Sequence, residues 1–216
     1  MDIKIDKDLL RSWCEMEDSS DYLERMVAFA NNSTKERFDV LLREYGQLLK
    51  ERIDYCKGIL NTHKDVLIYY TLAELYNRQD PDESPDYLYK RAVRYYCIKA
   101  VRLDRNYAPA WALLAYAYSW IALFGGDAGD DNVIADIKVL PIKEETGIES
   151  VLPASFSDIL SEGQKRKLKC IERAIYCIRK ALKIEPLNTA YQFHLKQYCH
   201  QRNEEYKPEN LPRSLM

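Results

Sequence analysis

The sequence predicts an all-α protein, and three observations carry this prediction. The chain has 216 residues with only 7 glycines and 8 prolines, although 31% of its residues are charged. Few helix breakers and many charges favour long helices over many short strands, which need frequent turns. Hydrophobic residues make up 47% of the chain, too many for a disordered polypeptide, and they recur mostly at steps of three and four residues.

Polar clusters and hydrophobic spacing set the expected helices in order along the chain. The Ser and Asp cluster at 19–21 is a helix start signal, and Ser33 or Thr34 can cap the next helix. Pro81 and Pro85 lie in an acidic loop that separates two further helices. The predicted helices cover about 22–30, 35–60, 65–78, 85–103, 108–124, 160–184 and 187–202.

The chain contains one uncharged stretch, at 106–126, that calls for a membrane test. A spanning helix needs about 20 mostly apolar residues, but Pro109 and the pair Gly125-Gly126 shorten the helical part. The stretch is also rich in Ala and Tyr. We therefore expect a helix buried between neighbouring helices and no membrane span.

The N-terminus and the cysteines indicate a cytoplasmic protein. Residues 1–8 alternate in charge and lack the apolar core of a secretory signal. The six cysteines are scattered through helical segments without a C-x-x-C pair. A disulfide framework would suit a smaller secreted chain. We expect free thiols that pack as small hydrophobic groups in a reducing compartment.

Residues 125–164 depart from the helical pattern and predict a long insertion. Most of the glycines lie there, and the stretch carries nine acidic residues against Lys138 and Lys143. Its apolar residues allow an ordered excursion or a lid, because structureless loops of this length are uncommon. We expect one helical domain over 1–203, interrupted by this insertion and followed by a polar tail at 204–216.

Two helices carry the same internal pattern. An aromatic residue is followed by Leu-Ala and then by Tyr, at the spacing that places all of them on one helical face. The four positions are Tyr69, Leu72, Ala73 and Tyr76 in one helix, and Trp111, Leu114, Ala115 and Tyr118 in the other. The helices that precede Trp111 and follow the insertion share an Ala-apolar-basic-apolar-acidic ending, at 100–105 and 181–186.

This pattern resembles the tetratricopeptide repeat (TPR) family, whose first helix reads W-x2-L-G/A-x2-Y. The resemblance covers about residues 66–186 as two repeats, with degenerate helices on either side as caps. Ala174, Ile178, Ala181 and Pro186 match the second helix of a repeat. The departures are a first repeat longer than the family's 34 residues and a second repeat split by the insertion.

The resemblance implies a right-handed α-α superhelix that binds a peptide or a partner helix in a concave groove. The motif residues belong to the core, and the positions between them face the groove. Those positions are Tyr70, Glu74, Asn77 and Arg78 in one repeat, and Ala112, Tyr116, Ser119 and Trp120 in the next. The three aromatic residues among them are the stronger anchors, unless they pack on a neighbouring repeat. The Lys/Asn/Arg carboxylate clamp of chaperone-binding TPRs is absent here.

Charge is segregated along the chain, although the net charge is only −2. Basic residues concentrate on the helices at 85–103 and 160–184. The ones we select as a basic surface are Lys90, Arg91, Arg94, Arg102, Lys165, Arg166 and Arg173. They are either the solvated faces of surface helices or a site that the acidic insertion covers as a lid. An acidic partner or RNA is the alternative ligand class, although nucleic acid is disfavoured by the net acidity.

The sequence gives no reason to expect an enzyme, a cofactor or a metal. It contains no G-x-S-x-G, Walker A or H-E-x-x-H motif. His194, Cys199 and His200 do not share one helical face, and the acidic run at 127–132 lacks the central glycine and the terminal glutamate of a calcium loop at the proper spacing. The prediction is a protein-interaction scaffold whose oligomeric state and partner are not determined by sequence.

Overall fold

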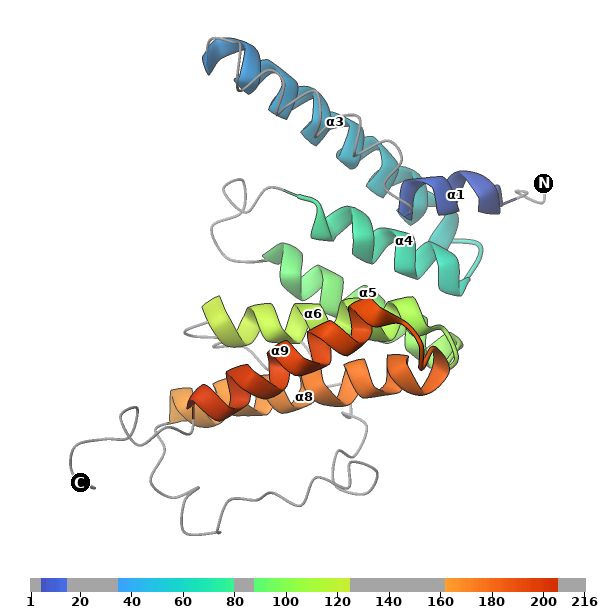
Figure 1. The fold of residues 1–216 in the computed structure, drawn as a ribbon. Helices are drawn as coiled ribbons and strands as arrows, with labels where there is room; N and C mark the ends of the chain where they lie inside the picture. Colours follow the sequence, from blue (N-terminus) through green and yellow to red (C-terminus); the bar gives the residue numbers. More distant parts are fainter. Residues whose placement is uncertain (1–4, 15–34, 80–87, 125–161, 206–216) are drawn as a thin grey trace. The chain divides into compact units, whose positions relative to one another are not determined.

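The computed structural model describes residues 5–14, 35–79, 88–124 and 162–205. Within these ranges all regular structure is α-helical, which confirms the predicted class (Figure 1). The helices are α1 (Lys7–Cys14), α3 (Lys35–Leu60), α4 (Val66–Asn77), α5 (Leu88–Leu103), α6 (Ala108–Phe124), α8 (Glu162–Ile184) and α9 (Thr189–Glu205).

The predicted bounds agree closely with these helices. The helices expected at 35–60 and 108–124 have the bounds of α3 and α6, and the other matching ends coincide or differ by at most three residues. Helix α1 was not predicted. The expected helix at 22–30, nearly all of the insertion and most of the polar tail lie outside the described residues.

The chain divides into two compact units, Met1–Leu113 and Leu114–Met216, with the boundary inside α6. In the first unit α4 is the central helix, because it packs against α5, α3 and α1. Its N-terminus is capped by Asp65, whose carboxylate accepts a hydrogen bond of 2.8 Å from the backbone N–H of Leu67. The helices thus pack mostly with their neighbours in sequence, with α1 as the exception.

One hydrophobic cluster joins α1, α3 and α4 in the first unit. Its buried members are Leu10, Trp13, Leu49, Ile53, Cys56, Ile59, Leu67, Ile68, Leu72 and Leu75. On α4, Ile68, Leu72 and Leu75 recur at steps of four and three residues and form one stripe, with Leu67 beside Ile68. The short helix α1 contributes two of the cluster's members, so it belongs to the core of this unit.

The second unit contains the C-terminal part of α6 together with α8 and α9, and α8 packs against α9. The apolar face of α8 is buried along its length at helical spacing. Its buried residues are Leu168, Ile171, Ala174, Ile175, Cys177, Ile178 and Ala181. Three of these are the residues that carry the resemblance in this helix, and all three are fully buried.

The burial expected for the repeated motif is largely confirmed. Leu72 and Ala73 of α4 are fully buried, and all four motif residues of α6 are buried. Tyr69 and Tyr76 are half-buried instead. Their rings stack on Tyr96 of α5, with centroids 6.4 Å and 5.6 Å away. The small Ala73 lies on the helix that packs most extensively on α5, where a larger side chain would hold the helices apart.

All six cysteines are free thiols, as predicted, and Cys56, Cys97 and Cys177 are buried. Burial raises the pKa of Cys56 to about 12, so this thiol stays protonated at neutral pH. Among the described residues, no helix has the length and apolar character needed to cross a membrane.

Candidate protein-binding surfaces

Of the four groove positions predicted on α4, Tyr70 and Arg78 contact other parts of the first unit. The Tyr70 hydroxyl donates a hydrogen bond of 2.7 Å to Glu74 Oε1, one turn along the helix. The Tyr70 ring also packs edge-on against Tyr107, with centroids 5.2 Å apart. Burial and the Glu74 carboxylate raise the pKa of Tyr70, so the hydroxyl remains a donor. Glu74 and Asn77 are half-buried.

Arg78, at the C-terminus of α4, binds the C-terminal end of α1. Its guanidinium donates hydrogen bonds to the backbone carbonyls of Trp13 and Cys14, the latter at 2.9 Å. These carbonyls are among the last four of α1, which have no partner within the helix. A cation at this end also interacts favourably with the helix dipole. Arg78 therefore binds the backbone of α1, and this contact does not depend on which side chains α1 carries there.

Two further contacts hold α1 along α4. Lys7 forms an ion pair of 3.1 Å with Asp65 at the start of α4. The Cys14 sulfur lies 3.2 Å from the Thr71 hydroxyl oxygen, and that hydroxyl also donates to the Leu67 carbonyl at 2.8 Å. The N-terminal ends of α1 and α4 lie together, and so do their C-terminal ends. The two helices therefore run in parallel (Figure 1).

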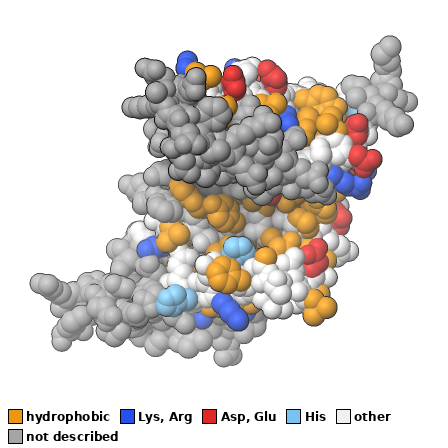
Figure 2. Space-filling view, turned by 45° about the horizontal axis from the view of Figure 1, so that its top comes forward, with side chains coloured by type: hydrophobic (Ala, Val, Ile, Leu, Met, Phe, Trp, Pro, Cys, Tyr) orange, Lys and Arg blue, Asp and Glu red, His pale blue; other side chains and the backbone are white. Residues whose placement is uncertain are grey.

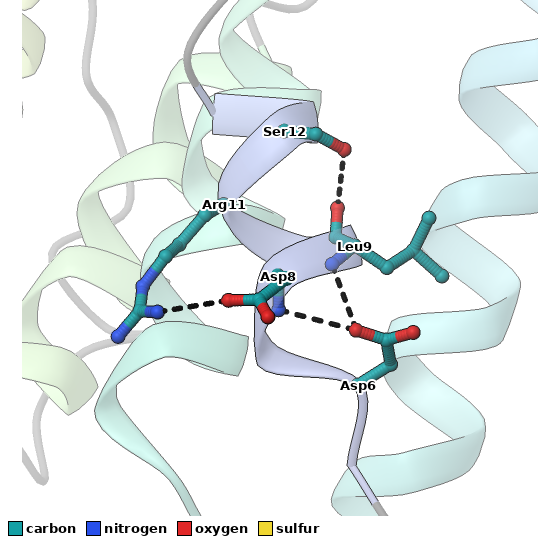
Figure 3. A network of polar contacts seen from close by, with 5 residues as sticks. All are labelled: Asp6, Asp8, Leu9, Arg11 and Ser12. Carbon is teal, nitrogen blue, oxygen red and sulfur yellow. Dashed lines mark hydrogen bonds and ion pairs between the residues drawn. The ribbon is translucent and has the colours of Figure 1, made fainter.

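Helix α1 is organised by its own N-terminal residues, which Figure 3 shows from close by. The Asp6 carboxylate accepts hydrogen bonds from the backbone N–H groups of Asp8 and Leu9, at 3.1 Å and 2.9 Å. Such a side-chain cap satisfies donors that lack a partner at a helix start. Arg11 donates to the Asp8 carboxylate at 3.0 Å on the exposed side.

On α6 the predicted binding residues divide into exposed and buried ones. Tyr116 is 37% exposed and Trp120 is half-buried, and the indole of Trp120 makes a side-chain hydrogen bond to Tyr116. Because an indole N–H can only donate, Tyr116 oxygen is the acceptor. Ser119 is only 7% exposed and its hydroxyl donates to Gln201 Oε1 of α9 at 3.2 Å. Ser119 is therefore a contact between helices and is not available to a partner.

Sequence analysis missed Leu123 on the same face. It lies seven residues after Tyr116, two helical turns along, and it is 53% exposed. The i, i+4, i+7 spacing with Tyr116 and Trp120 was present in the sequence, but an apolar residue at the end of a buried helix gave no sign of exposure. We call Tyr116, Trp120 and Leu123 the α6 stripe.

Tyr198 of α9 backs the α6 stripe from within the unit. It is 5% exposed, and its pKa is raised by burial and by the neighbouring Tyr116 and Cys177 groups. Burial raises the pKa of Tyr116 as well, although its hydrogen bond with Trp120 acts in the opposite direction. Both phenols are thus neutral at physiological pH, so the stripe carries no charge, and its one hydroxyl is that of Tyr116.

The residues selected as a basic surface do not form one set. Arg102 and Arg166 are exposed and Arg91 is half-buried. Arg94 is only 8% exposed, so it lies inside its unit and not on a basic surface. Arg173 places its guanidinium over the ring of Tyr118 at 5.6 Å. Lys90 and Lys165 lie in α5 and α8, and their side chains are outside the described part.

Figure 2 shows one face of the molecule, where hydrophobic side chains reach the surface in several patches between charged ones. Large apolar residues with more than a third of their surface exposed occur in both units. They are Leu9, Val40, Tyr55, Tyr95, Leu103, Tyr116, Leu123, Leu187 and Phe193. Of these, Tyr116 and Leu123 lie on one face of α6 together with Trp120, which the sequence had selected as an aromatic anchor.

The described residues contain no group of three or more His, Cys, Asp or Glu side chains that could hold a metal ion. Comparison with known proteins gives no further assignment: no family model, no curated protein and no solved structure matches the chain. In its described residues the protein is all-α, and its helices pack mostly with their neighbours in sequence.

Proposed function

We propose that this protein is a helical-repeat scaffold of the TPR type, with a right-handed superhelix, that binds a peptide or helix of a partner protein. The observation that carries the proposal is on α6. Its motif residues are buried, while Tyr116, Trp120 and Leu123 from the same helix stay at the surface in one stripe. Aromatic residues in such settings supply most of the energy of protein interfaces.

The α6 stripe is prepared for binding before a partner arrives. A side-chain hydrogen bond joins Trp120 to Tyr116, and the Ser119–Gln201 bond ties α6 to α9. Side chains that are already ordered lose less conformational entropy when a partner docks. A peptide with apolar side chains at helical or alternating spacing fits such a surface.

The test uses peptides selected from a random display library on the folded full-length protein. We expect the Tyr116→Ala/Trp120→Ala double variant to bind the selected peptides about 30-fold or more weakly, because a hot spot contributes at least about 2 kcal/mol. Fluorescence anisotropy at two salt concentrations measures the loss. Salt should change the affinity little, because the stripe is uncharged.

Tyr95→Ala is the matched control, since Tyr95 is 41% exposed on α5 and Tyr116 is 37% exposed. This control should leave peptide affinity unchanged. Circular dichroism establishes that both variants keep the helical fold. Equal affinity of the double variant and the wild type for every selected peptide would show that the α6 stripe is not the binding surface.

A second candidate function rests on α8, whose exposed face is basic. Arg166, Lys169, Arg179 and Lys183 are exposed there, and Lys180 packs its ammonium on the Tyr176 ring at 5.1 Å. Such a face suits an acidic protein segment or RNA. This function would show steep salt dependence, whereas binding by the α6 stripe would not.

If α8 binds single-stranded RNA, the slope of log affinity against log salt should flatten by about 1.4 in the Lys169→Glu/Lys183→Glu variant, for two lost phosphate contacts. The probe is a fluorescent poly-uridine oligonucleotide titrated at several salt concentrations. Lys50→Glu/Lys64→Glu, which reverses two exposed lysines of the first unit, is the control. The same slope in all three proteins rules out this role for α8.

A further inference from the structure

We infer that the face of α4 and α3 covered by α1 is a second binding surface, which accepts a partner's amphipathic helix carrying Leu and an aromatic residue three positions apart, in exchange for α1. This surface belongs to the first unit, and its inference does not depend on the proposal for the α6 stripe. The occupant is defined by the segment that already lies there.

The side chains that α1 inserts define the apolar half of the recognition. Leu10 is fully buried and Trp13 is 8% exposed, and both enter the cluster formed by α3 and α4. The Trp13 ring lies under the guanidinium of Arg52 at 5.1 Å, and meets Tyr55 edge-on at 5.5 Å. A helix that lays two anchors at i and i+3 into a groove is a recurring mode of peptide recognition.

The polar half of the recognition consists mainly of contacts with the C-terminal end of the helix. Arg78 binds the last carbonyls of α1, which every helix offers at its C-terminus. Two polar contacts with α4 involve α1 side chains: the Lys7–Asp65 ion pair, in which the Lys7 side chain is 54% exposed, and Cys14 against Thr71. An exposed ion pair adds little to affinity. A foreign helix with the same two anchors can therefore satisfy the site.

The size and exposed face of α1 make it suited to exchange. It has 8 residues, and an isolated helix of this length is not stable in water. Its order therefore depends on Asp6 and on the docking face. The other side is exposed, and its Asp8 and Arg11 side chains bond to each other (Figure 3). Because α1 is attached to the chain, a free peptide competes against an effective concentration on the order of 1 mM.

The experiment measures binding of a fluorescent synthetic peptide with the sequence of residues 5–14 to the full-length protein. In the Leu10→Asp/Trp13→Ala variant, α1 loses its anchors and the surface becomes vacant. We expect this variant to bind the peptide at least about tenfold more tightly than the wild type. Adding Arg78→Ala to it should weaken binding about tenfold, because the charged donor to two carbonyls is lost.

Two controls isolate the surface. Asp8→Ala/Arg11→Ala changes the exposed side of α1 and should bind the peptide as weakly as the wild type does. Trp120→Ala in the released variant should leave its peptide affinity unchanged, which separates this surface from the α6 stripe. If the released variant keeps its helical circular dichroism and binds the peptide no better than the wild type, the inference is wrong.

A measurement on the wild type covers the case in which the released variant does not fold. Excess unlabelled peptide should speed amide hydrogen exchange at residues 7–14 of the ¹⁵N-labelled protein, whereas a peptide with both anchors replaced by Ser should not. Unchanged exchange at millimolar peptide overturns the inference. So does exchange of α1 between two tagged copies with formation of a dimer, because the occupant is then a second copy and not a separate partner.

Discussion

Replacing Trp111 by Ala should lower the free energy of unfolding by about 3–5 kcal/mol, the usual cost of truncating a buried Trp. Trp111 is 4% exposed in the first turn of α6. Its indole N–H donates a hydrogen bond of 2.9 Å to the Arg105 carbonyl in the turn before the helix. The truncation therefore removes both the largest side chain of the motif and the tie between α6 and the preceding turn. Urea unfolding followed by circular dichroism measures the loss.

Trp111→Phe is the matched variant, because it retains an aromatic ring and removes the indole donor. We expect it to cost about 1–2 kcal/mol, from one hydrogen bond and a small loss of packing. The order wild type, Phe, Ala tests whether ring volume or the hydrogen bond dominates. A change below about 1 kcal/mol for the Ala variant would contradict the burial of this residue.

Replacing Ile175 by Ala should lower the free energy of unfolding by about 2–5 kcal/mol, because it leaves a cavity in the second unit. Ile175 is fully buried on α8, between Ile171 and Ile178 on the same face. The surroundings of such a residue relax only partly, so the lost transfer free energy and the cavity term add. Urea unfolding again provides the measurement, with fluorescence and circular dichroism compared in the same samples.

The matched control for Ile175 is Leu187→Ala, which removes a similar aliphatic side chain from a residue that is 88% exposed. Its effect should stay within about 0.5 kcal/mol, as is usual for surface substitutions. Comparable losses in the two variants would mean that the buried face of α8 is wrongly assigned. Non-coincident fluorescence and circular dichroism transitions would show that unfolding is not two-state.

The two proposed surfaces differ in what they ask of a partner. The α6 stripe offers preordered aromatic groups at the surface of the second unit. The α1 site offers an apolar face of α3 and α4 together with Arg78, and α1 already covers it. Arg78 had been selected from sequence as a groove residue, and the structure gives it a ligand within the same chain.

The helices and most of their buried faces could be predicted from sequence. Local rules decide them: a polar cap starts a helix, and apolar spacing of three and four selects the face that is buried. The bounds of α3 and α6 and the burial of Leu72 and Trp111 follow from such short-range information. The composition likewise predicted thiols that stay free.

The contents of the candidate surfaces were less accessible to sequence reasoning. Helix α1 escaped prediction because it is short, with only Leu10 and Trp13 buried along its length. Asp6 offered a helix-cap signal, but helical spacing of apolar residues over so short a segment is common by chance. The burial of Arg94 and the engagement of Ser119 by Gln201 also depend on residues outside their own helix turns.

Sequence by itself determined that this chain is helical, where its main helices begin and end, and which stripe of each helix is apolar. Only the tertiary structure decided that α1 lies along α4, that Arg78 binds its end, and which aromatic residues of α6 stay exposed. The physical reason is range. Helix propensity and periodicity act within a few turns, whereas burial, pairing and exposure depend on contacts between residues tens of positions apart.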